Sequence, residues 1–274
     1  MEELKYITSV QNPMVKYVLA LKDKSRERRN AGRFVVEGLK EIQMALKGHY
    51  VLDTVFFHPE FFPLQRVKEL LGKETQGTAL VEVSKEVYQR MAYRETTEGV
   101  LAIGQCKQHT LEDLGFKKGA PLILVAESPE KPGNIGALLR TADAANLDAV
   151  IIADPKGDLY NPNVIRSSIG CVFTNQVAMA TTQEVISFLK KKGMAIYCAA
   201  LSAPKKYTTV DYSAPTAIVV GTEATGLSRP WLENATANII IPMEGEIDSM
   251  NVSVSAAIVI FEAKRQRDPS FHEG

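Results

Sequence analysis

Three short stretches of the sequence combine glycines with polar side chains in a way that is typical of ligand-binding loops. The first, "ESPEKPGNIGALLR", holds Asn134, a candidate helix cap, and Arg140 near the expected start of a helix. The second, "GTEATGLS", places Glu223 between glycines, and the third, "IPMEGEIDSMNVS", ends with Ser249 and Asn251 nearby. Free helix N–H groups in the first stretch attract anions such as phosphate, and a carboxylate after a buried strand is costly unless it has partners. The three stretches together predict a ligand-binding site, although each alone also fits an ordinary cap or turn.

Each of these stretches follows or contains an apolar run that reads as a buried strand. The runs are "LILVAE", "AIVVGTE" and "NIIIPM", and further strands and helices alternate between residues 120 and 250. Continuous apolar strands alternating with helices predict a parallel sheet covered on both faces. Ligands of such sheets bind beyond the carboxyl ends of the strands, so the three loops are expected at one edge. The closing run "SMNVSVSAAIVIFEAKRQR" is predicted to be a helix despite its valines and isoleucines, because of its polar start and cationic end.

The first hundred residues follow a different pattern of short strands and helices, which predicts a small α/β sandwich. The polar stretch "KQHTLEDLGFKKGAP" follows without clear periodicity. We therefore expect a first domain over residues 1–106, a linker over 107–119 and a second domain over 120–274.

Charge is balanced over the 274 residues but not along the chain. The formal net charge is zero, whereas residues 16–33 hold seven basic and two acidic residues. Such a run is either a solvated helix face or a phosphate-contacting patch. The candidate phosphate contacts are Lys22, Lys24, Arg26, Arg28, Arg29 and Arg33, with Arg166 as a second candidate.

Several common sites are not supported by the sequence. A GxGxxG fingerprint after "LILVAE" and a Walker sequence are both absent, and the four histidines lie outside the three loops. The three cysteines match no zinc spacing and no disulfide framework, so we expect no metal and reduced, buried thiols. The chain has neither a signal-peptide pattern nor an apolar run of about 18 residues, so a cytoplasmic protein without a membrane partner is expected.

Taken together, "NIGALLRTADA", "IVVGTEATGLS" and "IPMEGEIDSMNVSVSAAI" resemble the three motifs of the SpoU (TrmH-like) branch of the SPOUT RNA methyltransferases, in the family's order. The first hundred residues are similar to the L30e-like RNA-binding extension of that family. The resemblance implies an α/β fold: a C-terminal parallel-sheet domain with a deep trefoil knot, a small N-terminal L30e-like domain and a homodimer formed through the C-terminal domain.

The resemblance also implies a cofactor, S-adenosylmethionine, and a reaction, methyl transfer to a ribose 2′-hydroxyl of RNA. The implied cofactor contacts are Gly221, Thr222, Gly226, Ile241, Met243 and Met250. The implied catalytic group is Arg140, surrounded by Asn134, Glu223, Ser249 and Asn251. Since a guanidinium rarely gives up a proton, we interpret Arg140 as a clamp for phosphate and the 2′-oxygen, with the base role as the alternative. Glu223 either pairs with Arg140 or accepts backbone N–H bonds.

The resemblance favours 23S ribosomal RNA as the substrate, with transfer RNA as the alternative. Two other classes of protein are alternatives. One is a non-catalytic RNA- or ribosome-binding protein, and the other is a nucleotide-dependent oxidoreductase, which the missing glycine fingerprint disfavours. The sequence does not distinguish a housekeeping role from an antibiotic-resistance role.

Overall fold

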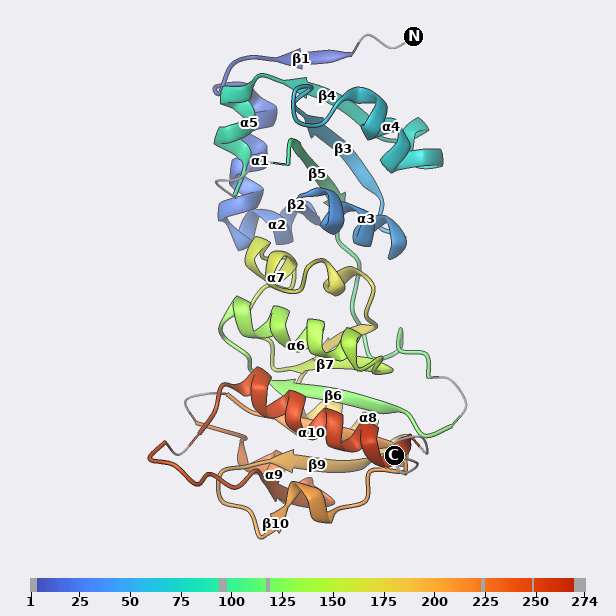
Figure 1. Cartoon of the computed structure of the whole chain (residues 1–274), viewed down its shortest axis with the longest axis vertical. Helices are drawn as coiled ribbons and strands as arrows, with labels where there is room; N and C mark the ends of the chain where they lie inside the picture. The colour runs from blue at the N-terminus through green and yellow to red at the C-terminus, as the bar shows by residue number, and fades with distance from the viewer. Residues whose placement is uncertain (1–3, 94–97, 117–118, 223–224, 248, 269–274) are drawn as a thin grey trace. The chain divides into compact units, whose positions relative to one another are not determined.

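A computed structural model describes residues 4–93, 98–116, 119–222, 225–247 and 249–268 of the chain (Figure 1). The chain divides into two compact α/β units. The first unit comprises residues 1–108 and 158–174, and the second comprises residues 109–157 and 175–274. None of the helices within the described ranges is both long and apolar enough to cross a membrane.

The second unit is built on a seven-stranded sheet in the order β10-β12-β9-β11-β6-β7-β8, and each pair of neighbouring strands is parallel. The strands are β6 (Leu122–Glu127), β7 (Ala149–Ala153), β8 (Val177–Ala180), β9 (Ala195–Ala199), β10 (Lys205–Lys206), β11 (Thr216–Val220) and β12 (Ala237–Ile240). Every residue of β6, β7 and β11 is buried. The predicted parallel sheet is thus confirmed, while the trefoil knot stays a prediction.

Helices cover both faces of this sheet. On one face, α6 (Pro132–Ala144) packs against α10 (Val252–Arg267), and on the other α8 (Thr182–Lys191) packs against α9 (Arg229–Asn234) (Figure 1). Alternate residues of β6, Ile123 and Val125, share an apolar core with Leu189 and Trp231 of the second pair. The sheet therefore forms the middle of three layers.

The closing helix forms where the sequence predicts it. Its buried residues, Ala256, Val259, Ile260 and Ala263, recur at helical spacing, and the Asn251 side chain caps its first turn. Burial of this stripe and the cap outweigh the modest helix-forming tendency of the β-branched residues.

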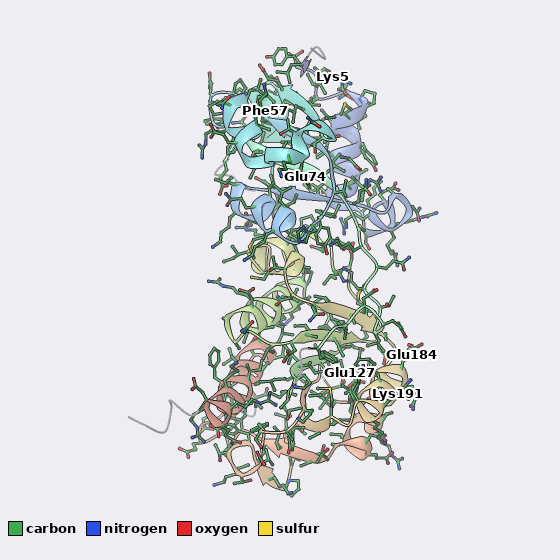
Figure 2. All side chains as sticks on the ribbon, turned by 90° about the vertical axis from the view of Figure 1, so that its right-hand side faces the viewer. Lys5, Phe57, Glu74, Glu127, Glu184 and Lys191 are labelled. Carbon is green, nitrogen blue, oxygen red and sulfur yellow. The ribbon has the colours of Figure 1, made fainter. Side chains whose placement is uncertain are left out.

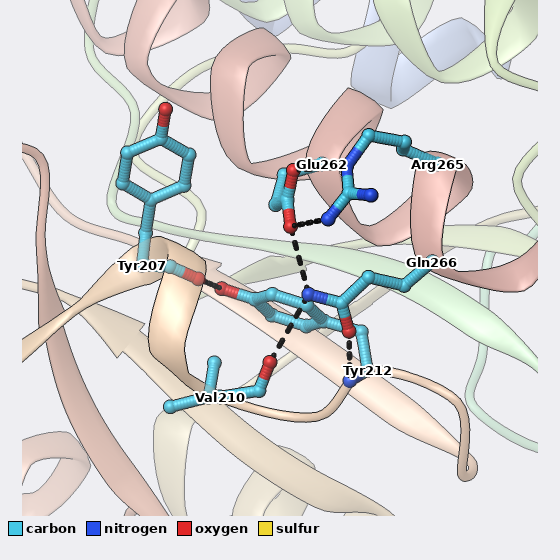
Figure 3. Close-up of polar contacts among 6 residues, drawn as sticks. All are labelled: Tyr207, Val210, Tyr212, Glu262, Arg265 and Gln266. Atoms are coloured by element: carbon cyan, nitrogen blue, oxygen red, sulfur yellow. Dashed lines mark hydrogen bonds and ion pairs between the residues drawn. The ribbon is translucent and has the colours of Figure 1, made fainter. Parts of the chain in front are cut away.

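A polar network holds the last turns of α10 against the segment before β11 (Figure 3). Gln266 Nε2 donates to the carbonyl of Val210 at 3.2 Å and to Glu262 at 2.8 Å, while Gln266 Oε1 accepts from the Tyr212 N–H at 3.0 Å. The Tyr212 hydroxyl donates to the carbonyl of Tyr207 at 2.8 Å, and burial raises the pKa of this hydroxyl. The network fixes the C-terminal end of α10 to residues 207–212, while the Asn251 cap holds its N-terminal end.

The first unit contains a five-stranded mixed sheet in the order β1-β4-β3-β5-β2. Strand β4 is parallel to β1 and β3, and β5 is antiparallel to β3 and β2. The strands are β1 (Lys5–Ile7), β2 (Arg33–Glu37), β3 (Leu52–Phe57), β4 (Ala79–Val83) and β5 (Val100–Gln105). The helices are α1 (Pro13–Asp23), α2 (Ser25–Ala31), α3 (Leu39–Lys47), α4 (Leu64–Leu71), α5 (Lys85–Met91) and α7 (Pro162–Ser167), with short 3₁₀ turns at Gly72–Gln76 and Cys171–Phe173.

Residues 158–174, which contain α7, belong to the first unit by packing rather than by chain order. The ring of Tyr160 stacks on that of Phe34, with centroids 5.0 Å apart. The ring of Phe173 also packs on Phe34, with centroids 5.1 Å apart. The Tyr160 and Tyr50 hydroxyls are 3.2 Å apart. The predicted domain division placed this whole segment in residues 120–274, because pairings between residues so distant along the chain leave no local pattern.

Candidate functional site

A cavity of about 240 Å³ opens at the carboxyl ends of β6 and β11, which are adjacent strands of the second sheet. Its walls come from the loop after β6, the turn after β11 and the first turns of α6 and α10. The wall residues include Ala126, Pro129, Asn134, Gly221, Thr222 and Val252. The cavity occupies the position where parallel α/β sheets bind ligands, and it unites residues from all three loops that the sequence singles out.

Gly221 begins the turn after β11 and has no room for a side chain. A Cβ atom there would lie 2.3 Å from the carbonyl carbon of Gly226 and 2.5 Å from the backbone nitrogen of Leu227. Thr222 and Gly226 exchange two backbone hydrogen bonds of 3.1 Å, and Gly226 has a φ of +68°, which favours glycine. The turn therefore folds back on itself and brings bare backbone to the cavity wall.

The N-cap of helix α6 lies three residues earlier than the sequence predicts. Lys131 is its N-cap and Pro132 its first residue, so the interpretation of Asn134 as the cap is wrong. Proline suits this position because its missing N–H would be unpaired there in any case. The Asn134 side chain instead accepts a 3.1 Å hydrogen bond from Asn251 Nδ2. Two of the five predicted catalytic residues are thus in direct contact.

Other predicted site residues lie outside the described cavity wall. Arg140 is exposed on α6, six residues beyond Asn134, and is not part of the described cavity wall. Ser249 is exposed, shortly before α10. Glu223 lies outside the described residues. Three predicted cofactor contacts lie partly buried on the loop between β12 and α10, outside the described wall: Ile241, Met243 and Met250.

Further wall residues were missed from the sequence. Glu130, Lys131 and Leu138 also line the cavity, and Glu130 forms a 2.7 Å ion pair with Lys156. Glu130 and Lys131 lie within the first of the three quoted stretches, directly before the helix start. This position was the sequence signal that could have identified them as wall residues.

Only some side chains of the predicted basic patch are exposed. Lys24, Arg26 and Arg29 are exposed around α2. The prediction that Arg28 contacts phosphate is wrong. Arg28 is 2% exposed, and its Nε donates to Asp158 at 2.6 Å. A buried guanidinium paired in this way is a structural ion pair and cannot reach RNA.

The remaining basic candidates have partners as well. Arg33 is half-buried and pairs with Asp53. Lys22 donates to the carbonyls of Met91 and Ala92 at 3.3 Å each. Arg33 and Lys22 therefore have less freedom to meet phosphate than the exposed residues of α2.

The second basic candidate, Arg166, is exposed on α7 within the same unit. Its guanidinium lies 5.8 Å from the centre of the Tyr93 ring, and both residues line a shallow pocket together with Lys22. The fold therefore brings Arg166 beside the N-terminal candidates although they are far apart in sequence.

The three cysteines, Cys106, Cys171 and Cys198, are reduced, as the sequence predicts. Cys171 and Cys198 are buried, and Cys106 is partly buried. Burial raises the pKa of Cys106 and of Cys198 to about 12. Neither of these two thiols is a nucleophile near neutral pH.

Comparison with known proteins identifies both parts of the chain. Residues 121–261 match the SpoU rRNA Methylase family, and residues 12–102 match the MRM3-like substrate binding domain. A 23S rRNA (guanosine(2553)-2′-O)-methyltransferase, RlmP of Bacillus subtilis, is 29% identical over 95% of this chain and 100% of its own length.

Solved structures agree with these matches. A crystal structure of an RNA 2′-O ribose methyltransferase is 37% identical, with a TM-score of 0.82 over 96% of this chain and 99% of its own. An AdoMet-bound rRNA methyltransferase from Sinorhizobium meliloti is 28% identical, with a TM-score of 0.87 over 96% and 98% of the two chains. With the family match covering more than half of its length, the chain belongs to the SpoU rRNA methylase family.

Proposed function

We propose that this protein transfers a methyl group from S-adenosylmethionine to a ribose 2′-hydroxyl of 23S ribosomal RNA. The observation that carries the proposal is the cavity beyond β6 and β11, bounded by the Gly221 turn and adjoining the Asn134–Asn251 contact. Membership of the SpoU rRNA methylase family supports it, as do relatives named as 23S rRNA 2′-O-methyltransferases.

The cavity fits a nucleoside-like cofactor. Its wall at Gly221 is bare backbone, so N–H and C=O groups can approach a ligand closely. Lys131 and Glu130 offer opposite charges at the same wall, which suits an amino acid moiety with an ammonium and a carboxylate. When bound, S-adenosylmethionine supplies an electrophilic methyl group on a positively charged sulfur.

The chain's own residues must orient the ribose and stabilise negative charge on the 2′-oxygen as its proton leaves. We assign the charge-stabilising role to Arg140, whose fork can bind a phosphate and the reacting oxygen. Asn134 and Asn251 fix one another through their side-chain amides and position the cavity rim, with Ser249 and Glu223 as further candidates.

RNA binding is assigned to exposed basic residues of the first unit. We retain Lys24, Arg26, Arg29 and Arg166, and exclude Arg28 because it is buried. The match of residues 12–102 to a substrate-binding domain supports this placement.

A homodimer formed through the second unit also belongs to the proposal. Phe261 and Val254 of α10 are 51% and 48% exposed. Large apolar side chains exposed on one helix are suited to packing against a second copy.

Methyl transfer to defined RNAs tests the function. The purified protein is incubated with radiolabelled S-adenosylmethionine and with transcripts of 23S rRNA or transfer RNA, and the modified ribose is mapped by its block to alkaline cleavage. We expect label at a single 2′-oxygen of 23S rRNA. Label on transfer RNA alone would contradict the substrate, and RNA binding without transfer under any condition would favour the non-catalytic alternative.

A further inference from the structure

A buried carboxylate lies beneath the cavity without being part of its wall. Glu127 is the last residue of β6 and is 6% exposed. Its neighbour Ala126 lines the cavity. Because successive side chains of a strand point to opposite faces, Glu127 is directed toward the layer of α8 and α9. Figure 2 shows Glu127 within the second unit and Glu184 at its surface.

Two donors satisfy this carboxylate. Glu127 Oε2 accepts the backbone N–H of Ser228 at 2.8 Å, and Oε1 accepts the hydroxyl of Thr182 at 3.4 Å. The Thr182 oxygen in turn accepts the indole N–H of Trp231 at 3.2 Å. One side chain thus connects β6, the first residue of α8 and the chain that enters α9.

The bond to Ser228 acts close to the cavity wall. Ser228 follows Leu227, whose backbone nitrogen is among the atoms that pack against Gly221. Leu227 is itself buried. Any shift of the Ser228 N–H toward solvent would therefore move the backbone at Gly226 and Leu227 away from Gly221 and change the shape of the wall.

The chemistry of this site fits a carboxylate better than an apolar residue. An ionised carboxylate is an acceptor only, and both of its oxygens face donors. Removing it would leave the part-buried Ser228 N–H without this partner and would leave the buried Thr182 hydroxyl without its acceptor, which is costly. Burial, with a smaller contribution from Glu127, raises the pKa of the neighbouring Cys198 thiol to about 12.

We propose that Glu127 is a positioning residue, which holds residues 225–228 against Gly221 through the Ser228 N–H and so keeps the cofactor cavity in its binding shape. The inference rests on the proposed function, since it concerns the same cavity. Glu127 does not touch the cofactor in this assignment; it acts on the backbone that does.

Calorimetric titration with S-adenosylmethionine tests the proposal without requiring activity. We expect Glu127→Ala to weaken cofactor binding about tenfold or more, because the Ser228 N–H loses a buried, charged acceptor. Glu127→Gln should restore binding to within about threefold, because an amide oxygen can accept from Ser228 while the amide nitrogen donates to Thr182.

Leu189→Ala is the matched control for stability. Leu189 is fully buried on α8 and takes part in neither hydrogen bond of Glu127, so its truncation lowers the melting temperature while both bonds stay in place. We expect Leu189→Ala to bind the cofactor with wild-type affinity. Equal weakening in Leu189→Ala and Glu127→Ala at similar melting temperatures would reduce Glu127 to a purely structural role and overturn the proposal.

Ser228→Pro is the second variant, should Glu127→Ala fail to fold. It removes the donated N–H together with a hydroxyl that makes no capping hydrogen bond, and the φ of −68° at Ser228 is one that proline adopts. It should weaken cofactor binding as much as Glu127→Ala, and wild-type affinity in either variant would overturn the assignment. If the wild-type protein bound no S-adenosylmethionine, the proposed function would fail first, which is a separate result.

Discussion

At the scale of single residues, Arg140 separates two chemical roles that the sequence leaves open. Its side chain is exposed on α6 and outside the described cavity wall, as expected of a group that meets RNA rather than the cofactor. We predict that Arg140→Lys lowers kcat about 100-fold, because an ammonium keeps the charge but cannot form the guanidinium fork. Cofactor affinity should not change. Single-turnover methylation and calorimetry measure the two quantities, and near-wild-type kcat would favour the base role.

Gly221 offers a test of the turn itself. A methyl group there would lie within 2.5 Å of the Gly226 and Leu227 backbone, so Gly221→Ala must open the turn. We predict that cofactor binding is lost and that the free energy of unfolding falls by about 1–3 kcal/mol. Gly115→Ala is the matched control, since its nearest neighbour is 3.8 Å away. Calorimetry and thermal melting compare them, and unchanged affinity in Gly221→Ala would contradict this role of the turn.

The residues that sequence reasoning found and missed differ in a physical way. Gly221 has a local signal because it directly follows an apolar strand, and Asn134 and Asn251 have one because amides are favoured at helix starts. Glu127 stands at a strand end within the first quoted stretch, but its partner donors, from Thr182 and Ser228, come from distant parts of the chain and leave no local signal. Sequence therefore predicts where a site lies more readily than what supports it.

At the scale of elements, α2 shows that adjacent arginines can have opposite roles. Arg28 is buried against Asp158, whereas Arg29 is exposed. We predict that Arg28→Ala lowers the free energy of unfolding by about 2–4 kcal/mol, because the largely buried Asp158 carboxylate loses its guanidinium. Arg29→Ala should change stability by less than about 0.5 kcal/mol. Chemical denaturation measures both, and equal effects would contradict the assignment of Arg28 as structural.

The exposed side of α2 gives the complementary prediction for RNA. Charge reversal in Arg26→Glu with Arg29→Glu should weaken binding of an rRNA fragment. The slope of log affinity against log salt concentration should fall by about one unit for each phosphate that these arginines neutralise in the wild type. The melting temperature should stay near that of the wild type. Filter binding across salt concentrations provides the measurement, and unchanged RNA affinity at low salt would make the patch an ordinary solvated helix face.

The types of the elements were predictable where burial leaves a local pattern in the sequence, either a continuous apolar run or a helical stripe. The all-buried strands β6, β7 and β11 and the stripe on α10 are local patterns. The predicted and observed starts of α6 differ because the sequence offers two start signals, Pro132 and Asn134. The helix begins at Pro132, a position that proline favours.

At the scale of the whole molecule, the compact units do not follow the order of the chain. Residues 158–174 return to the first unit, where Tyr160 and Phe173 pack on Phe34 and Asp158 pairs with Arg28. Pairings of this kind cannot be read from a single sequence, because no local period records them. A first unit built from residues 1–108 alone would therefore lack part of its own core.

This packing makes a direct prediction for fragments of the chain. A fragment of residues 1–108 should melt well below the first unit of the full-length protein, because Phe34 and Tyr50 lose their aromatic partners and Arg28 loses Asp158. Loss of aromatic packing and of a largely buried ion pair removes a large part of the roughly 5–15 kcal/mol that stabilises a folded domain. Joining residues 158–174 to the fragment through a Gly/Ser linker should restore cooperative unfolding. Circular dichroism during heating compares the two fragments, and equal melting curves would mean that residues 158–174 do not stabilise the first unit.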